Sequence, residues 1–304
     1  MLSLSTMKGV FHYLIFAGLL LLTACYTPRT ESAAHQFSIP QPSAMLDRAA
    51  QIDFLRYHYW DNFNFADTVA LQRADTAEME RHFSQYVALL STAPRDRAPM
   101  DSLMKRAATS RLALDYFSML AARVLHDPNA ALRSSELYIP VLEAQLQAPY
   151  YDEYDRLVTT HDLQVARQNR LGEPANDFRF LTRTGENRSL YELQSDYTLI
   201  FFSNPDCSMC RMLKELLLHS ALIVERISEG RLTMLVINPD EEPSARKSEE
   251  LPHGWIEGHD LNGSIQSDQL YDLRAIPSIY LLEREKRVLV KDSTDPREVE
   301  EALR

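Results

Sequence analysis

The sequence predicts an all-α region followed by an α/β region with a central sheet. Across residues 44–171, apolar residues recur at the three- and four-residue spacing of amphipathic helices. From about residue 172 onward the pattern changes to short apolar runs separated by turn residues and charged stretches. Strands that alternate with helices form a sheet covered by helices on both faces. We therefore expect an all-α domain at residues 44–171 and an α/β domain at residues 172–304.

Four helices are expected in the all-α domain. The first begins near Asp75, the second spans about 101–127, the third begins near Ser134, and the fourth runs from Asp152 to Gly172. Each starts at a residue type that caps helix N-termini, and the later ones end near proline or glycine. An aromatic cluster precedes these helices and is better explained by packing than by ligand binding. Its members are Phe54, Tyr57, Tyr59, Trp60, Phe63 and Phe65.

The α/β domain shows strand and helix patterns in alternation. A first strand is indicated by Phe178 and Phe180, with a turn at 183–187 after it. Apolar runs then indicate the strands, and amphipathic stretches and a charged loop fall between them. Strands are expected at 197–202, 232–237, 278–282 and 288–290, helices at about 207–230, 265–273 and 296–303, and a charged loop at 240–252.

Two cysteines, Cys207 and Cys210, stand where the strand ending in Phe201-Phe202 passes through a short turn into a helix. The N-terminus of a helix has unpaired N–H groups and a positive dipole end, which stabilise a thiolate. A thiolate is the nucleophile of disulfide exchange, and a second thiol one turn away can resolve the mixed disulfide. This spacing therefore predicts that Cys207 attacks and Cys210 resolves.

The first 25 residues have the pattern of an export signal. Lys8 precedes an apolar run from residue 10 to 22, and Leu-Thr-Ala-Cys follows with its cysteine at Cys25. This ending resembles a bacterial lipobox, which implies a signal peptide at 1–24 and lipidation, including palmitate, on Cys25. Residues 25–43 are rich in Ser, Thr, Pro, Gln and Ala and are expected to form a flexible tether. Tyr26 follows in place of an aspartate that would favour the inner membrane, so we expect an outer-membrane lipoprotein facing the periplasm.

Charge and cysteine content limit the kinds of partner and metal site that the chain can have. The formal net charge of −11 argues against a nucleic-acid partner. With Cys25 lipidated, two of the three cysteines remain, so the close pair serves chemistry or one local bond. A structural zinc site would need two further ligands at short spacing, which the sequence lacks. Copper held by the two thiols and a histidine is a weaker alternative, with His219, His253 and His259 as the histidines that spacing alone does not place.

Residues 174–304 resemble a thioredoxin-like domain of the cell-envelope type. The resemblance rests on the strand ending in Phe202, on Cys207-Ser208-Met209-Cys210 opening a helix, and on Ile276-Pro277-Ser278 starting a later strand. It implies a central mixed sheet flanked by helices and a cis-proline at Pro277 that packs against the cysteines. Ile276 and Pro277 are then expected to shape the substrate groove, where a bound chain can pair by strand addition. No cofactor is expected.

The helical half also resembles a known domain, one of unknown function that precedes thioredoxin-like domains in envelope lipoproteins. The residues that carry this likeness are 57–63, Asp127-Pro128-Asn129 and 136–143. The stretch from Asn169 to Phe178 resembles the usual junction with the redox domain. This likeness names no substrate.

The motif departs from thioredoxin at positions that tune the pair. Asp206 replaces a tryptophan, and an anion beside Cys207 opposes thiolate formation. Ser208 and Met209 replace Gly-Pro, and Phe201 stands where thioredoxin has a buried acid that moves protons. These changes affect the rate and the redox potential of exchange.

Together these patterns predict an envelope thiol–disulfide oxidoreductase that exchanges electrons with protein dithiols and with an electron donor or acceptor partner. Two alternatives stay open. One is a redox-inactive binding or adaptor lipoprotein that uses the same fold as a scaffold. The other is a copper-binding delivery protein.

Overall fold

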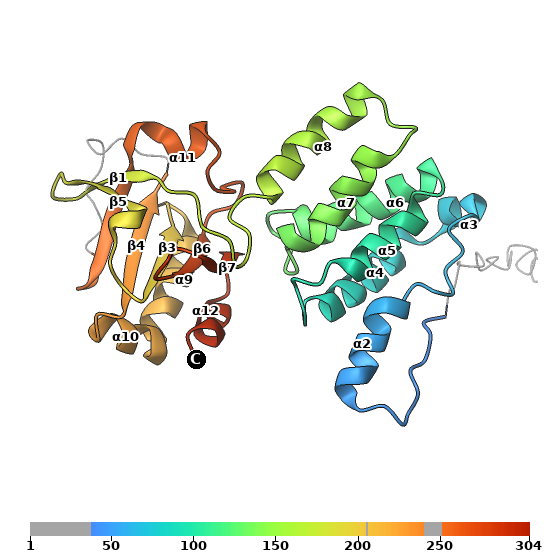
Figure 1. The fold of residues 1–304 in the computed structure, drawn as a ribbon, viewed down its shortest axis with the longest axis horizontal. Helices are drawn as coiled ribbons and strands as arrows, with labels where there is room; N and C mark the ends of the chain where they lie inside the picture. Colours follow the sequence, from blue (N-terminus) through green and yellow to red (C-terminus); the bar gives the residue numbers. More distant parts are fainter. Residues whose placement is uncertain (1–37, 205, 240–250) are drawn as a thin grey trace, which may run out of the picture.

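A computed structural model describes residues 38–204, 206–239 and 251–304. The expected signal peptide, Cys25, most of the tether and the charged stretch 240–250 lie outside these ranges. Within the described residues, no helix combines the length and apolar character needed to cross a membrane. Figure 1 shows a helical part and an α/β part side by side, joined by the segment that follows α8.

The helical part consists of short helices with capped N-termini. Asp75, Ser134 and Asp152 each accept a backbone N–H at the start of a helix, as the sequence predicts. The helices are α2 (Arg48–His58), α3 (Thr68–Arg73), α4 (Thr76–Leu90), α5 (Ala98–Ala107), α6 (Arg111–Ala121), α7 (Ser135–Gln147) and α8 (Glu153–Ala166), with a π-turn at Ala122–His126.

Three expectations for the helical part are wrong. The region expected as one long helix at 101–127 contains two helices. Ser110 separates them and caps α6 by accepting the N–H of Ala113 at 3.1 Å. The last helix ends at Ala166 rather than at Gly172. Helices α2 and α3 were not expected, and both begin at aspartates, Asp47 and Asp67, that accept a backbone N–H.

The aromatic cluster forms the core of the helical part, which confirms the packing interpretation for four of its residues. Trp60, Phe63 and Phe65 surround Phe117 with ring centroids 5.1 to 5.3 Å away. All four side chains are buried, and so is Tyr59. Phe54 is only half-buried, and Tyr57 is 44% exposed, so these two lie at the surface.

The α/β part is built on a seven-stranded mixed sheet in the order β2-β1-β5-β4-β3-β6-β7. The central strands β3, β4 and β5 are parallel, and the remaining pairs are antiparallel. The strands are β1 (Arg179–Thr182), β2 (Asn187–Ser189), β3 (Tyr197–Phe202), β4 (Leu232–Asn238), β5 (Trp255–Asp260), β6 (Ser278–Glu283) and β7 (Val288–Ser293).

Helices cover the sheet on both faces, as predicted. Side chains of β3 alternate between two cores: Leu199 and Phe201 pack with α9 and α10, whereas Ile200 and Phe202 face the opposite layer with Tyr271. The helices are α9 (Ser208–His219), α10 (Ala221–Ser228), α11 (Ser264–Ser267) and α12 (Pro296–Ala302), with short 3-10 turns at Leu190–Glu192 and Leu261–Gly263.

The sequence patterns missed or misplaced several of these elements. β5 was not expected because its sequence is polar and contains a glycine, Gly258. The structure explains this glycine, since a Cβ there would lie 2.7 Å from side-chain atoms of Ile237 and Phe180. The cysteine helix ends at His219, since Ser220 caps a separate α10. The helix expected at 265–273 is the single turn α11.

We predict that Phe117→Ala lowers the free energy of unfolding of the helical part by about 3 to 5 kcal/mol, because the side chain is fully buried against three other rings. The measurement is urea unfolding followed by Trp60 fluorescence in a Trp255→Phe background. Tyr154→Ala serves as control, since Tyr154 is 84% exposed. Equal unfolding midpoints for the two variants would contradict the prediction.

Candidate functional site

Cys207 lies at the junction of strand and helix. It is the N-cap residue of α9, and its Sγ accepts a hydrogen bond from the backbone N–H of Cys210 at 3.1 Å. The residue is partly exposed, and both cysteines are free thiols. An N–H aimed at an accessible sulfur at a helix N-terminus is the arrangement of a nucleophilic cysteine.

Cys210, in contrast, is buried in the first turn of α9. Its side chain packs in the same apolar cluster as Phe201, Leu213 and Ile279, and the residue is 1% exposed. Burial raises the pKa of the Cys210 thiol from 9.0 to about 12, partly opposed by hydrogen bonds from Asn204 and Ser203. The two thiols therefore differ sharply in access.

Sequence reasoning did not identify Ser203, although it lies next to the strand end that carries the motif. Phe201, at the position of the thioredoxin acid, is buried in the cluster beside Cys210. The Ser203 side chain lowers the pKa of the Cys210 thiol, in opposition to the effect of burial. Ser203 is thus a polar side chain that acts on this thiol where the acid is absent. Its place directly after β3 was the available signal.

Ile276 and Pro277 lie against Cys207. The Ile276–Pro277 peptide bond is cis, as the resemblance implies. The Cys207 thiol donates to the Ile276 carbonyl oxygen at 3.7 Å. The paired register of β6 with β3 begins at Ser278, so Ile276 and Pro277 stand just outside it. The structure therefore brings together all four residues expected at the redox centre and groove.

The flanking residues present a mixed surface beside the thiols. Asp206 and Ser208 are exposed, and Met209 is 53% exposed. Met209 starts an apolar stripe along α9 that continues with Met212 and Leu216, which are 51% and 50% exposed. These side chains share one helix face because they stand three and seven residues apart. An accessible apolar surface thus adjoins Cys207.

A groove of about 290 Å³ opens beside the redox pair. One side consists of Met209, Ile276 and Pro277, together with residues 291–295 and Glu298. The other side comes from the helical part, from the turn between the π-turn and α7, which we name the 128–133 turn. No sequence pattern indicated that the helical part reaches this site.

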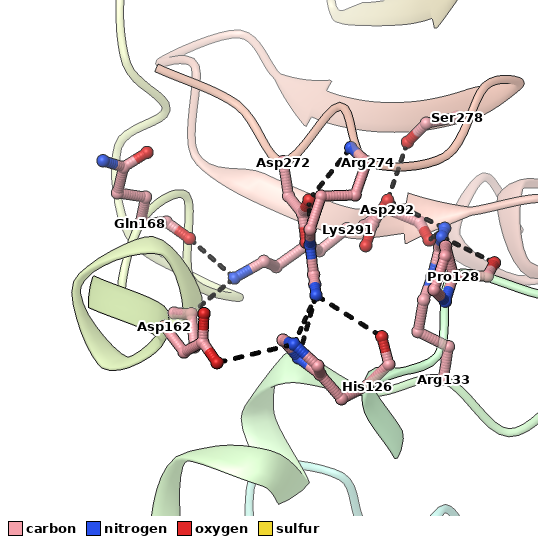
Figure 2. Close-up of polar contacts among 11 residues, drawn as sticks. His126, Pro128, Arg133, Asp162, Gln168, Asp272, Arg274, Ser278, Lys291 and Asp292 are labelled. Carbon is pink, nitrogen blue, oxygen red and sulfur yellow. Dashed lines mark hydrogen bonds and ion pairs between the residues drawn. The ribbon is translucent and has the colours of Figure 1, made fainter. Parts of the chain in front are cut away.

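The 128–133 turn is tied to the α/β part by a buried ion pair. Arg133 donates to both the side chain and the carbonyl oxygen of Asp292 at 2.8 Å, and to the carbonyl oxygen of Pro128 at 3.0 Å. The Ser278 hydroxyl, directly after Pro277, donates to the same Asp292 carboxylate at 2.9 Å. Figure 2 shows Asp292 between Arg133 and Ser278.

Two further contacts join the parts (Figure 2). Lys291 donates to the carbonyl oxygens of Ala166 and Gln168 at 2.9 and 2.6 Å, and so satisfies carbonyls at the C-terminus of α8. Arg274 donates to the ring of His126 and to Asp272. Burial and Arg274 both lower the pKa of His126, which favours the neutral, accepting ring.

The histidines whose positions the sequence spacing left open are the candidates for metal ligation. His219 donates from Nδ1 to the Glu215 carbonyl oxygen of its own helix at 2.7 Å. His259 lies on β5 with Nε2 at 3.9 Å from Glu257. In the part of the chain that the structure describes, no three His, Cys, Asp or Glu side chains are grouped to hold a metal ion.

Comparison with known proteins finds similarities for both parts of the chain. The family model of a domain of unknown function (DUF5106) matches residues 23–169. A thioredoxin-like protein from Bacteroides caccae has a solved structure with 35% sequence identity and a TM-score of 0.79, and the match covers 88% of this chain and 98% of that one. No curated protein matches the sequence.

Shorter structures match the α/β part. A conserved protein of unknown function from Bacteroides fragilis is 40% identical over 43% of this chain and 98% of that one, with a TM-score of 0.41. The thioredoxin domain of a thiol-disulfide oxidoreductase from Bacteroides vulgatus is 17% identical over 44% of this chain and 99% of that one, with a TM-score of 0.36.

The fold and the full-length match define a class. The chain belongs to the thioredoxin-like proteins, since it shares 35% of residues with a member across nearly the whole of that member. Its N-terminal part carries the domain of unknown function, and its fold is the mixed sheet with flanking helices predicted above.

We predict that iodoacetamide alkylates Cys207 roughly a hundredfold faster than Cys210, or more, because Cys210 is buried and its pKa is raised to about 12. The measurement is mass spectrometry of the reduced full chain carrying Cys25→Ser after timed alkylation at pH 8. In urea the two thiols should react at similar rates. Similar rates in the folded protein would contradict the arrangement.

A second prediction concerns Asp292. Burial raises its pKa from 3.8 to about 6, against the opposing effect of Arg133. An acid whose pKa is higher in the folded state stabilises the fold at low pH, and this contribution is lost as the pH rises from about 4 to about 6. Replacing Asp292 by Asn should remove this pH-dependent loss of stability, which amounts to as much as roughly 3 kcal/mol in the free energy of unfolding.

The measurement for Asp292→Asn is the free energy of unfolding from pH 4 to 7. Asp295→Asn is the control, because the hydrogen bond to Arg297 lowers the pKa of Asp295. A carboxyl with a lowered pKa contributes stability that is present at neutral pH and lost on acidification, so its replacement changes the curve in the opposite sense. An unchanged pH dependence in Asp292→Asn would refute the prediction.

Proposed function

We propose that this protein is a membrane-anchored periplasmic thiol–disulfide oxidoreductase that exchanges electrons with protein dithiols through Cys207 and Cys210. The observation that carries the proposal is the asymmetry of the pair. Cys207 is accessible at the N-terminus of α9, and Cys210 is buried one turn behind it. Such a pair can attack an external disulfide and then resolve the product internally.

In the reducing direction, the Cys207 thiolate attacks a disulfide sulfur of the substrate. A new disulfide forms between Cys207 and that sulfur, and the partner sulfur leaves as a thiolate that takes up a proton. Cys210, once deprotonated, attacks the Cys207 sulfur, the mixed disulfide breaks, and the second substrate thiolate leaves. The substrate gains two electrons and two protons, and the protein keeps a Cys207–Cys210 disulfide. The oxidising direction is the reverse.

The residues around the pair have distinct roles in this scheme. The Ile276 carbonyl oxygen lies 3.7 Å from Cys207, so Ile276 and Pro277 border the position of the attacked sulfur. Ser203, through its contact with the Cys210 thiol, stands where it can assist the loss of the Cys210 proton. The exposed stripe of Met209, Met212 and Leu216 offers apolar surface to a protein substrate.

The cellular placement is part of the proposal and rests on the sequence. The apolar run and Leu-Thr-Ala-Cys before residue 26 support cleavage after residue 24 and lipidation of Cys25. A lipidated Cys25 and a Ser- and Pro-rich tether would hold the folded body at the periplasmic face of the outer membrane. Incorporation of labelled palmitate into the chain, and its loss in Cys25→Ser, tests the lipidation on which this placement depends.

A second candidate function is a binding or adaptor lipoprotein in which the cysteine pair is structural. Phe201 in place of an acid and the raised pKa of Cys210 favour it, because both slow the resolving step. Under this alternative, capture of a protein partner would survive loss of both cysteines.

We predict that Cys207→Ser abolishes disulfide exchange, while Cys210→Ser keeps the first step and accumulates mixed disulfides. The measurement is insulin disulfide reduction by the full chain carrying Cys25→Ser, with trapped adducts detected by non-reducing electrophoresis. Ser102→Ala is the control, since Ser102 is exposed on α5 in the helical part. Retention of full activity by Cys207→Ser would falsify the oxidoreductase proposal.

A further inference from the structure

The groove beside the redox pair is formed jointly by the two parts of the chain. Met209, between the two cysteines, and Ile276-Pro277 belong to the α/β part. The facing residues Pro128, Asn129, Ala130, Ala131 and Arg133 belong to the helical part. The match to a domain of unknown function covers these helical residues.

The 128–133 turn has the rigidity that a binding wall requires. Asn129 and Ala130 donate their backbone N–H groups to the side chain and carbonyl of Asp127 at 2.8 and 3.0 Å. Arg133 donates its backbone N–H to the Ala130 carbonyl at 3.2 Å. Its guanidinium, with a side chain only 10% exposed, binds Pro128 at one end and Asp292 at the other.

The same ion pair fixes the turn relative to the redox centre. Asp292 accepts from Ser278, and Ser278 follows Pro277 directly. One carboxylate therefore holds both the helical wall and the residue next to the cis-proline. A shift of the 128–133 turn cannot occur without breaking a buried ion pair, which is costly when one charge is left without its partner.

The groove lies close to the attacking sulfur, because Ile276 lines the groove and its carbonyl oxygen contacts Cys207. Its volume of about 290 Å³ lies near the lower end of the roughly 300 to 1,000 Å³ typical of ligand sites. This volume has room for a short stretch of chain but not for a folded domain. The wall includes small side chains at Ala130 and Ala131, which leave room along it.

We propose that the 128–133 turn of the helical domain is a specificity-determining wall of the substrate groove, and that the groove takes the extended polypeptide segment flanking a substrate cysteine. The inference rests on the proposed oxidoreductase function and deepens it. It assigns to the helical domain the selection of polypeptide disulfides over small-molecule disulfides. Ala131, which is exposed in the groove, is the position at which this selection can be altered without disturbing the core.

The test compares two mixed disulfides with the same leaving group, thionitrobenzoate: one on the single cysteine of an unstructured twelve-residue peptide, the other on 2-mercaptoethanol. Pre-reduced full chain carrying Cys25→Ser supplies the electrons. Cys207 attacks the peptide or mercaptoethanol sulfur, coloured thionitrobenzoate leaves, and Cys210 then releases the substrate thiol as the protein disulfide forms. No external reductant is needed, and single-turnover rates are read against substrate concentration.

Ala131→Trp should raise the half-saturating concentration for the peptide about tenfold or more, because the larger side chain overfills the groove. The rate with the mercaptoethanol disulfide should stay unchanged. Val158→Trp, which adds the same bulky side chain at a 67% exposed site on α8 outside the groove, should behave as the parent chain on both substrates. The proposal is supported if Ala131→Trp weakens the reaction with the peptide disulfide and leaves the reaction with the mercaptoethanol disulfide unchanged.

Two outcomes overturn the inference, and they differ in whether the proposed function survives. If the parent chain releases thionitrobenzoate from both substrates and Ala131→Trp changes neither rate, or changes both equally, the groove wall has no role in selection and the oxidoreductase function stands. If the parent chain releases thionitrobenzoate from neither substrate, the oxidoreductase function fails, and the inference that rests on it fails as well.

Discussion

A single buried carboxylate links the parts of this molecule that surround its thiols. Asp292 accepts hydrogen bonds from Ser278, beside the cis-proline, and from Arg133 of the helical part. Its side chain is 5% exposed, so the charge depends on Arg133 for compensation. Even with this partner, burial raises the pKa of Asp292 to about 6. The joint between the two parts is therefore maintained at the cost of burying a charge.

The redox pair follows from the local geometry of a strand that meets a helix. β3 ends at Phe202, a short turn follows, and Cys207 caps α9, so the sulfur receives a helix N–H and remains accessible. The same geometry buries Cys210 against Phe201. Because Phe201 cannot take up a proton, the polar groups of Ser203 and Asn204 are what the structure offers to the buried thiol. The consequence is a pair in which the first thiol is accessible and the second is strongly shielded.

The helical domain gains a physical connection to the chemistry through the joint. Its aromatic core is a packing feature, as Trp60 and Phe117 show. Its contribution to the redox centre comes instead from an irregular turn between helices, where Arg133 and the small side chains beside it face Met209 and Pro277. Loops carried by a rigid scaffold often supply such recognition elements. A domain that only tethered the α/β part would have no need of a buried ion pair at this place.

The sequence by itself determined the class of fold and the position of the cysteine pair between a strand and a helix. Hydrophobic periodicity separated helices from strands, and Cys207, Cys210, Ile276 and Pro277 were recognised from their local contexts, since a strand end, a helix start and a proline before a strand are encoded by neighbouring residues. Hydrophobic periodicity failed where single polar residues start a new helix, as at Ser110 and Ser220. It also failed at β5, whose sequence is polar and contains Gly258. Only the tertiary structure placed Arg133 against Asp292, 159 residues away along the chain. No local pattern encodes such a contact, because it arises when two surfaces that are far apart along the chain meet.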